Sequence, residues 1–306
     1  MALSCTVCVS AAEDETIKLT VWGAEEDQDL LKELTDKFQE KYADQKFDIQ
    51  IGVESESTAK DTILTDVEAG ADVYAFADDQ LTDLVKAGAL LKLDDYAEAL
   101  QLADTTLDDV KAANVEGAID AASWDSLLEA ADKAGKKVGM TLASGNLVAC
   151  VSGTWDAITA QDVFGDGYAA TKLPTFTVGD KQVQQGSVAG YKYVGVNGYS
   201  ENSGWAVLLA EYLTNEESQQ MFFDQRESGP SNKNVAASDS VQENVALAAL
   251  SAQSEYAQAQ KVGGKYWDSA QTFGELVAQG TLSADDDNAI QEALDNLVDG
   301  VTAPVE

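Results

Sequence analysis

The sequence lacks histidine altogether and has a single arginine, Arg226, among its 306 residues. Without histidine, the commonest general base, the commonest metal ligand and every histidine-based triad are excluded. One arginine cannot build a cluster of bidentate forks around a phosphate or sulfate. Basic residues are also scarce, because 19 Lys+Arg stand against 54 Asp+Glu and give a formal net charge of −35. This charge argues against nucleic acids and anionic membrane surfaces as partners, so we expect neutral or cationic ligands.

Cysteine and proline are nearly absent, with three of each. Cys5 and Cys8 lie near the amino terminus, and Cys150 stands inside the apolar run 147–151, where we expect a small buried side chain rather than a catalytic thiolate. The pattern predicts no disulfide framework, no metal site and no Pro-rich linker. Nevertheless, 45% of the residues are hydrophobic, which is enough for packed cores, and the length suggests about two domains.

The first twelve residues are uncharged and mostly apolar, and three acids follow at once. A secretory signal also carries a basic start, which is missing here, so we interpret residues 1–15 as the remnant of a signal peptide. Ala2-Leu3-Ser4-Cys5 resembles a lipobox, in which Cys5 would carry a lipid. A first β-strand is the alternative. The protein is expected to be extracytoplasmic, either lipid-anchored or freely secreted.

Hydrophobic periodicity predicts alternating strands and helices in the first third of the chain. Strands are expected at 17–23, 47–53 and 71–76. Helices are expected around Leu30–Tyr42, around Ile63–Val67 with Gly70 as a left-handed cap, and around Leu81–Val85 with Gly88. This order indicates βαβ units and a largely parallel sheet. Ligands of such sheets bind beyond the carboxyl ends of the strands, here at 22–25 and 76–80.

The remainder of the chain is predicted to be mixed and then helical. Strands are expected at 137–142, 147–151, 168–173 and 191–196, and helices at 124–134, 155–161, 204–213, 216–225, 241–260, 266–279 and 286–298. Asp285-Asp286-Asp287 could begin a calcium loop, but the glycine and the terminal glutamate of that motif are missing. We interpret the three acids as a helix start.

Four segments, in this order, resemble the family 1 extracellular solute-binding proteins, the sugar receptors of ABC importers, of which the maltose/maltodextrin-binding proteins are typical. They are Leu19–Gly23, the opening strand and first binding loop; Gly70–Gln80 followed by Ala87–Leu91, similar to "G-x-D-[VI]-…-A-x-D" and "xxGxLxxL"; Val151–Trp155 with Lys172-Leu173-Pro174, similar to "[IM]-x-G-x-W" and "xLP"; and Val194–Asn197 leading into Trp205–Glu217. Together they cover most of residues 16–300.

The resemblance implies an α/β, two-lobe periplasmic-binding-protein-like fold (type II) that closes on a sugar. It implies lobe I from 16–119 and 197–240, and lobe II from 120–196 and 241–306. Two family segments after residues 122 and 145 are missing, so lobe II is expected to be shortened and incomplete. By position, the resemblance assigns ligand contacts to Trp155, Trp267, Phe76, Asp79, Gln80, Glu25 and Asp27.

Each of these residues also has a structural interpretation. Trp155 follows Gly-Thr at a strand-to-helix turn, which favours ligand contact over a place in the core. Trp267 could instead pack with Tyr266, and Asp79 could cap the helix beginning at Leu81. The remaining tryptophans, Trp22, Trp124 and Trp205, are expected to be packing residues.

The predicted function is a monomeric binding protein that delivers a neutral, maltodextrin-like oligosaccharide to the membrane permease of an ABC importer. No enzymatic activity, cofactor or metal is implied, and no nucleic acid partner. Two alternatives remain open. One is a truncated, binding-defective receptor. The other is a secreted glycosidase, which would need two carboxylates at a defined separation across a cleft.

Overall fold

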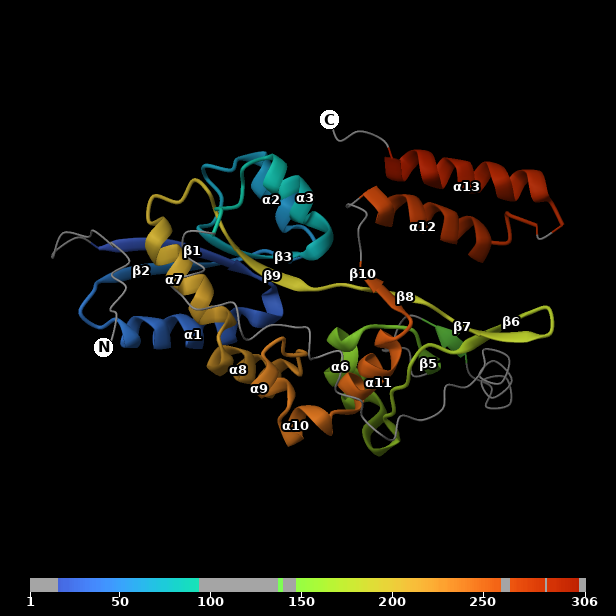
Figure 1. Ribbon diagram of the computed structural model, residues 1–306, viewed down its shortest axis with the longest axis horizontal. Coiled ribbons are helices and arrows are strands. Elements are labelled where there is room, and N and C mark those ends of the chain that lie inside the picture. The colour runs from blue at the N-terminus through green and yellow to red at the C-terminus, as the bar shows by residue number, and fades with distance from the viewer. Residues whose placement is uncertain (1–15, 94–136, 140–146, 260–264, 284, 303–306) are drawn as a thin grey trace.

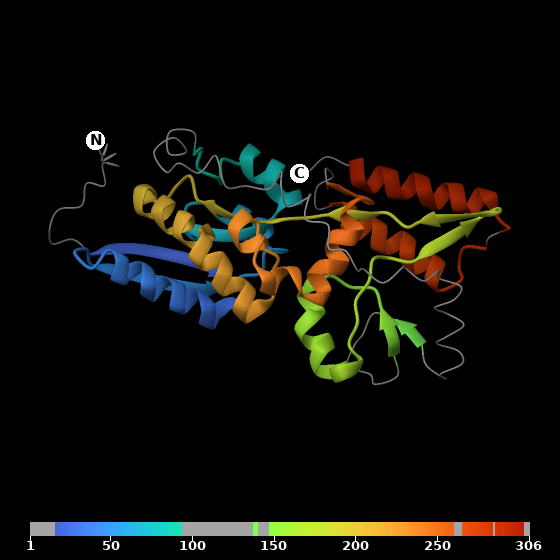
Figure 2. The same cartoon turned by 60° about the horizontal axis from the view of Figure 1, so that its bottom comes forward.

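The computed structural model describes residues 16–93, 137–139, 147–259, 265–283 and 285–302. Its elements form two groups that lie side by side along the longest axis (Figure 1), and Figure 2 shows the same separation from a second direction. We name them the first lobe, built on the amino-terminal strands, and the second lobe, which holds the middle strands and the last two helices. The fold is therefore mixed α/β with two lobes.

A four-stranded sheet forms the centre of the first lobe, in the order β2-β1-β3-β9. Strands β1 (Ile17–Gly23), β2 (Phe47–Val53) and β3 (Val73–Ala77) run parallel, and β9 (Lys192–Val196) is antiparallel to β3. Parallel neighbours need a crossover connection, and the amphipathic segments between them supply it as helices.

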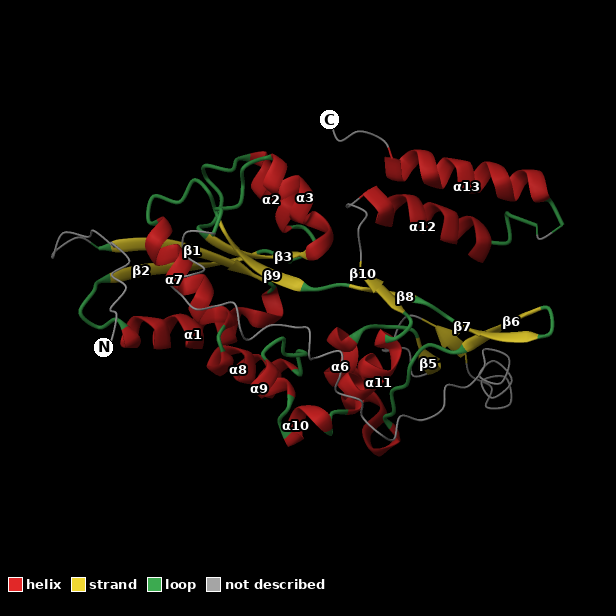
Figure 3. Cartoon of the chain, viewed as in Figure 1, coloured by secondary structure: helices red, strands yellow, loops and turns green. Residues whose placement is uncertain are grey.

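Helices cover both faces of this sheet (Figure 3). Helices α1 (Gln28–Lys41), α7 (Ser203–Thr214) and α8 (Glu216–Arg226) share a core with alternate residues of β1, among them Leu19 and Val21. The short helices α2 (Ala59–Thr65) and α3 (Leu81–Lys86) share the other core with Tyr74 and Phe76 of β3. Because successive side chains of a strand point to opposite faces, β3 contributes to both cores, with Val73 in the first and Tyr74 in the second.

The second lobe is built from pairs of strands with helices beside them. Its sheets are β4 (Lys137–Gly139) with β5 (Leu147–Cys150), the hairpin of β6 (Thr175–Val178) and β7 (Lys181–Gln184), and β8 (Ser187–Ala189) with β10 (Ala257–Ala259). Its helices are α6 (Ala157–Phe164), α11 (Val245–Ser254), α12 (Lys265–Ala278) and α13 (Asp287–Thr302). Helices α12 and α13 pack on each other.

The chain passes between the lobes at two described places. The first is Gly190-Tyr191, between β8 and β9. The second follows α8, where the short helices α9 (Lys233–Ala236) and α10 (Asp239–Gln242) lead into α11. Since β9 pairs with β3, residues 192–196 lie with the first lobe here. The lobe boundaries expected from the sequence otherwise stay a proposal.

Most of the expected elements are present, and the first two strands have the expected bounds. Gly88 has the left-handed φ of +70° expected of a helix cap. Asp286 accepts a hydrogen bond from the backbone N–H of Ala289 at 3.0 Å, which fits the interpretation of this acidic run as a helix start. Trp205 is buried, as expected, and its ring packs edge-on against Phe47 and Tyr42.

Three expectations are wrong. Gly70 is not a left-handed cap, because α2 ends five residues earlier, at Thr65, and Gly70 is not among the positive-φ glycines of the described chain. The strand expected at 168–173 is absent, and the strand begins at Thr175 instead. The helix expected at 241–260 is divided into α10, α11 and strand β10.

Other expectations fall on residues outside the description. These are the segment 1–15 with Cys5, the helix 124–134 with Trp124, and the two deletions expected after residues 122 and 145. Cys150 is half-buried, and burial, followed by the charge of Asp156, raises the pKa of its thiol. Within the described ranges, none of the helices is both long and apolar enough to cross a membrane.

Candidate ligand-binding site

Several predicted site residues gather at one edge of the first-lobe sheet. The carboxyl ends of parallel strands β1, β2 and β3 meet there, followed by the segments 24–28, 54–57 and 78–80. Strand β9 starts at the same edge, because Lys192 pairs with Ala77, the last residue of β3. We call this surface the sheet edge. It is the position at which open α/β sheets bind ligands.

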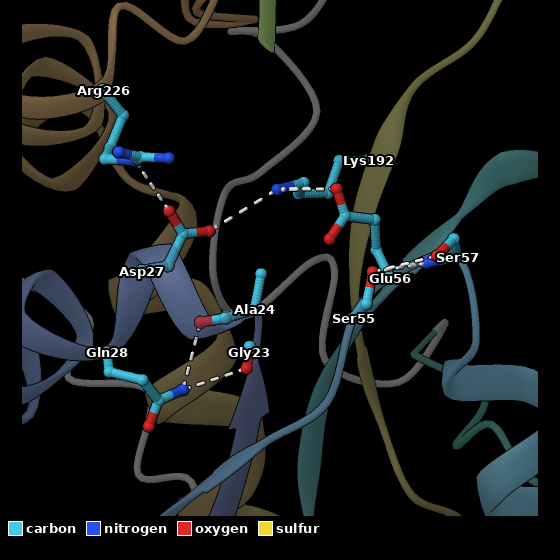
Figure 4. Close-up of polar contacts among 9 residues, drawn as sticks. All are labelled: Gly23, Ala24, Asp27, Gln28, Ser55, Glu56, Ser57, Lys192 and Arg226. Atoms are coloured by element: carbon cyan, nitrogen blue, oxygen red, sulfur yellow. Dashed lines mark hydrogen bonds and ion pairs between the residues drawn. The ribbon is translucent and has the colours of Figure 1, made fainter. Parts of the chain in front are cut away.

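The carboxylate of Asp27, at the sheet edge, contacts two cationic side chains (Figure 4). Asp27 is only 7% exposed, and its carboxylate accepts from the Arg226 Nε at 3.1 Å and lies 3.5 Å from the Lys192 Nζ. The backbone that presents it is held by Gln28, whose Nε2 donates to the carbonyl oxygens of Gly23 and Ala24. Asp27 is thus an internal counter-ion for two cations, a function that its sequence position did not indicate.

Lys192 joins two segments of the sheet edge, since its Nζ lies 3.0 Å from the Glu56 Oε1 as well as near Asp27. Burial lowers the pKa of Lys192, but the charges of Glu56 and Asp27 together outweigh burial, and the pKa is raised above 10.5. The ammonium is therefore charged at neutral pH and already shared between two carboxylates.

Gln80 is 3% exposed, and both ends of its amide are used inside the first lobe. Its Nε2 donates to the carbonyl oxygens of Glu56 and Ser57, each at 2.8 Å, and its Oε1 accepts from the backbone N–H of Lys60 at 3.1 Å. These bonds fix the segment after β2 against the segment after β3. In this conformation Gln80 is a buried residue that holds the loops of the sheet edge in place.

Asp79 forms a hydrogen bond with the second lobe. Its Oδ2 accepts from the indole Nε1 of Trp267, on α12, at 3.0 Å. The two residues are 188 positions apart in the chain, and both were expected at the site. Trp267 is 53% exposed and also touches the Tyr266 ring edge-on, as the structural interpretation expected, while its contact with a ligand stays a prediction. Asp79 is not the N-cap of α3, since that position is Gln80.

Trp155 lies in the short turn Thr154–Asp156 before α6 and is 79% exposed, the highest fraction among the exposed large hydrophobic side chains of the described residues. Its ring lies directly over Gly153, where an added Cβ would come within 2.1 Å of Cζ3. The turn is held by a hydrogen bond from Ser152 to the carboxylate of Asp156. An exposed, oriented aromatic face suits a sugar platform better than a core residue.

The remaining predicted contacts are placed differently. Phe76 is 2% exposed and lies between the rings of Tyr74 and Tyr193, at 5.8 and 5.7 Å, so in this conformation it belongs to the core beneath the sheet edge. Glu25 is exposed in the turn after β1. Asp78, which the sequence did not single out, is half-buried at the same edge, and burial raises the pKa of its carboxyl above 3.8.

Two hollows of the described surface lie elsewhere. One, of about 480 Å³, is at the opposite end of the sheet, and the other, of about 490 Å³, lies beside α2 and Trp22. In the first, the Asp72 carboxylate is occupied by the backbone and hydroxyl of Thr20 and the hydroxyl of Ser200. We favour the sheet edge, because the carboxyl ends of the parallel strands meet there. The described residues hold no group of acids and cysteines placed to bind a metal ion.

Residues 132–249 match a family model described as bacterial extracellular solute-binding protein. A search of curated proteins found no match.

Many solved structures share the fold. The maltodextrin-binding protein MalE1 of L. casei BL23 has 18% identity and a TM-score of 0.73, over 94% of this chain and 99% of that one. The maltose-maltodextrin binding protein of Alicyclobacillus acidocaldarius has 15% identity and a TM-score of 0.70, over 92% and 100%. The acarbose-binding GacH receptor of Streptomyces glaucescens has 14% identity and a TM-score of 0.71, over 95% and 100%.

These identities are low, so the structures establish the fold. The family match extends over residues 132–249, which run from the second lobe through β9 into α11. The resemblance to extracellular solute-binding proteins predicted from the sequence is therefore confirmed, by this match in the middle of the chain and by the two-lobe fold of maltodextrin-binding proteins.

Proposed function

We propose that the protein is an extracytoplasmic substrate-binding protein that captures a neutral, maltodextrin-like oligosaccharide between its lobes and delivers it to the permease of an ABC importer. One observation carries this proposal. The Trp267 indole of the second lobe donates to Asp79 at the sheet edge of the first, so both lobes contribute to one surface. A ligand that contacts both lobes favours the closed arrangement, which is how such receptors bind.

The chemistry of this surface suits a sugar. Trp267 offers an exposed aromatic face at this surface, and Trp155 offers another on the second lobe; such faces pack against the apolar C–H side of a sugar ring. Glu25 and Asp79 carry carboxylates, which accept hydrogen bonds from hydroxyl groups. The structure gives Asp27, Gln80 and Phe76 internal partners, and in the proposal they shape the site rather than touch the ligand.

The proposal assigns no catalysis to the protein. The family match and the structural relatives are binding proteins, and a two-carboxylate glycosidase has no supporting observation in the described residues. The expected extracytoplasmic location, periplasmic or at the cell surface and with or without a lipid on Cys5, follows from the same proposal. Its most direct test is binding.

The experiment is a calorimetric titration of the whole chain with maltotriose, with intrinsic tryptophan fluorescence followed in parallel. Saturable binding is expected, and Trp155→Ala should weaken it. A matched control is Tyr199→Ala, which removes an exposed ring at the opposite end of the first-lobe sheet and should bind as the unaltered chain does. Absence of heat with maltotriose and longer maltodextrins, in a chain that circular dichroism shows to be folded, would refute the proposal in favour of a binding-defective receptor.

A further inference from the structure

Glu227 has an unusual backbone conformation. It directly follows α8, with φ 51° and ψ 26°, and it is the one non-glycine residue with a positive φ in the described part of the chain. The left-handed region is unfavourable for a side chain longer than that of glycine, asparagine or aspartate. Such a residue persists only where its surroundings hold it, and these positions cluster at switches and other functional sites.

The side chain of Glu227 is held by the second lobe. Its carboxylate accepts from the Gln161 Nε2, on α6, at 3.0 and 3.1 Å, and from the Asn244 Nδ2 at 3.0 Å. Asn244 is the N-cap of α11, since its Oδ1 accepts from the backbone N–H of Leu247. Glu227 therefore ties the end of α8 to two helices of the second lobe.

The preceding residue is held by the first lobe. The Arg226 Nε donates to Asp27, and the same carboxylate lies near Lys192, the first residue of β9 (Figure 4). Two consecutive residues at the end of α8 thus contact opposite lobes. The left-handed turn at Glu227 is what directs the second side chain away from the first.

At the other crossing, the residues on the two sides of Gly190 also contact different lobes. Ala189 pairs with Ala259 in the second lobe, whereas the carbonyl of Tyr191 accepts from the backbone N–H of Asp78 in the first. Gly190 is the single residue between these contacts. Lys192 then joins this crossing to Asp27, so one carboxylate of the first lobe holds both crossing segments.

We propose that Asp27 and Glu227 are the positioning residues of the hinge between the lobes, which the chain crosses at Gly190 and on the way from α8 through α9 and α10 to α11. Ser231, Asn232 and Asn234 stay bound to Gln219 and Glu216 of α8, so on this second path the chain leaves the first lobe after α10. Asp27 fixes the first-lobe side of both crossings, and Glu227 fixes the second-lobe side of α8. Closure then occurs by rotation at the two crossings, because hinges are a few residues at element ends that absorb the change in φ and ψ. The inference rests on the proposed function only for the identity of the ligand on which the lobes close. The hinge contacts themselves can be tested in the ligand-free protein.

The test measures the distance between the lobes by double electron–electron resonance in the ligand-free chain. Spin labels are placed on cysteines introduced at the exposed positions Glu40, on α1, and Asp295, on α13, with Cys5, Cys8 and Cys150 replaced by alanine. Glu227→Gly accepts the left-handed backbone but loses the carboxylate, so the distance distribution should broaden about twofold. Glu227→Gln keeps an amide oxygen for Gln161 or Asn244 and should restore most of the original width.

Glu255→Gly is the matched control, since Glu255 also ends a helix, α11, but has a right-handed backbone and an exposed side chain and lies outside both crossing segments. It should leave the distribution unchanged. An unchanged distribution in Glu227→Gly would overturn the inference. If circular dichroism shows that Glu227→Gly does not fold, Asp27→Asn takes its place. Losing the charge at Asp27 should loosen both crossings and broaden the distance distribution. A distribution of unaltered width in Asp27→Asn would equally overturn the inference. Maltotriose, added afterwards, tests the proposed function separately.

Discussion

The orientation of the Trp155 ring depends on the absence of a side chain at Gly153. A Cβ at this position would lie 2.1, 2.3 and 2.4 Å from the ring atoms Cζ3, Cη2 and Cε3. Carbon atoms in contact are about 3.5–4.0 Å apart, so Gly153→Ala must displace the ring by more than about 1 Å. Because the ring is 79% exposed, it can move into solvent with little loss of folding stability.

The proposed function gives this displacement a measurable consequence. If the Trp155 face packs on a sugar ring and the shift removes about 60–80 Å² of apolar contact, the loss is roughly 1.5–2 kcal/mol. The dissociation constant for maltotriose should then rise about 10- to 30-fold in Gly153→Ala, with an unchanged melting temperature. The assay is a calorimetric titration, with thermal unfolding followed by circular dichroism.

A double-mutant cycle separates ring displacement from any other effect of the new methyl group. In a chain that already carries Trp155→Ala, Gly153→Ala should have no further effect on affinity, because the ring it displaces is gone. Gly167→Ala is the matched control, since no atom lies within 4 Å of the added Cβ. Unaltered affinity in Gly153→Ala, or effects that simply add in the double variant, would refute the reasoning.

Two further predictions concern the sheet edge. Gln80→Leu leaves the carbonyl of Ser57 and the N–H of Lys60 without this partner, while the Glu56 carbonyl keeps the N–H of Ala77, so the free energy of unfolding in urea should fall by about 1–3 kcal/mol; an unchanged value would contradict the role of Gln80. The folded-state pKa of Lys192 is raised, so its stabilisation is complete below its unfolded pKa of 10.5 and is lost as pH rises through the folded value. Unfolding midpoints should therefore fall more steeply above pH 10.5 in the unaltered chain than in Lys192→Met, and parallel profiles would count against the ion pairs.

The elements that the sequence predicted well are those whose signal is local. Strands Ile17–Gly23 and Phe47–Val53 alternate apolar and polar residues and have the expected bounds. The strand expected at 168–173 failed because its backbone finds other partners. The N–H of Leu173 donates to the side-chain amide of Gln253, and its carbonyl accepts from that of Gln184. Side chains distant in sequence thus replace the ladder, which periodicity cannot indicate.

The division of the expected helix 241–260 has a similar cause. Asn244 begins α11 as an N-cap, and Ala257–Ala259 form a strand because β8 is there to pair with them. The cap was recognisable, since asparagine is a preferred N-cap residue, but the pairing depends on a strand about 70 residues away. The resemblance named both Trp267 and Asp79, and the structure joins them by a hydrogen bond that it did not predict, whereas the 199-residue separation of Asp27 from Arg226 hid their ion pair.

The charges of the sheet edge bear on the ligand class. Both described cations there, Lys192 and Arg226, are engaged by carboxylates, Lys192 by Asp27 and Glu56 and Arg226 by Asp27. A phosphorylated or otherwise anionic sugar would have to break these pairs and leave a buried carboxylate without its counter-ion, which is strongly unfavourable. It would also approach a chain of net charge −35. The neutral oligosaccharide that we propose as ligand would meet neither obstacle, because its hydroxyl groups could donate to exposed carboxylates such as Glu25 without disturbing the ion pairs. The same charge pairs that hold the crossing segments therefore also select against anionic ligands.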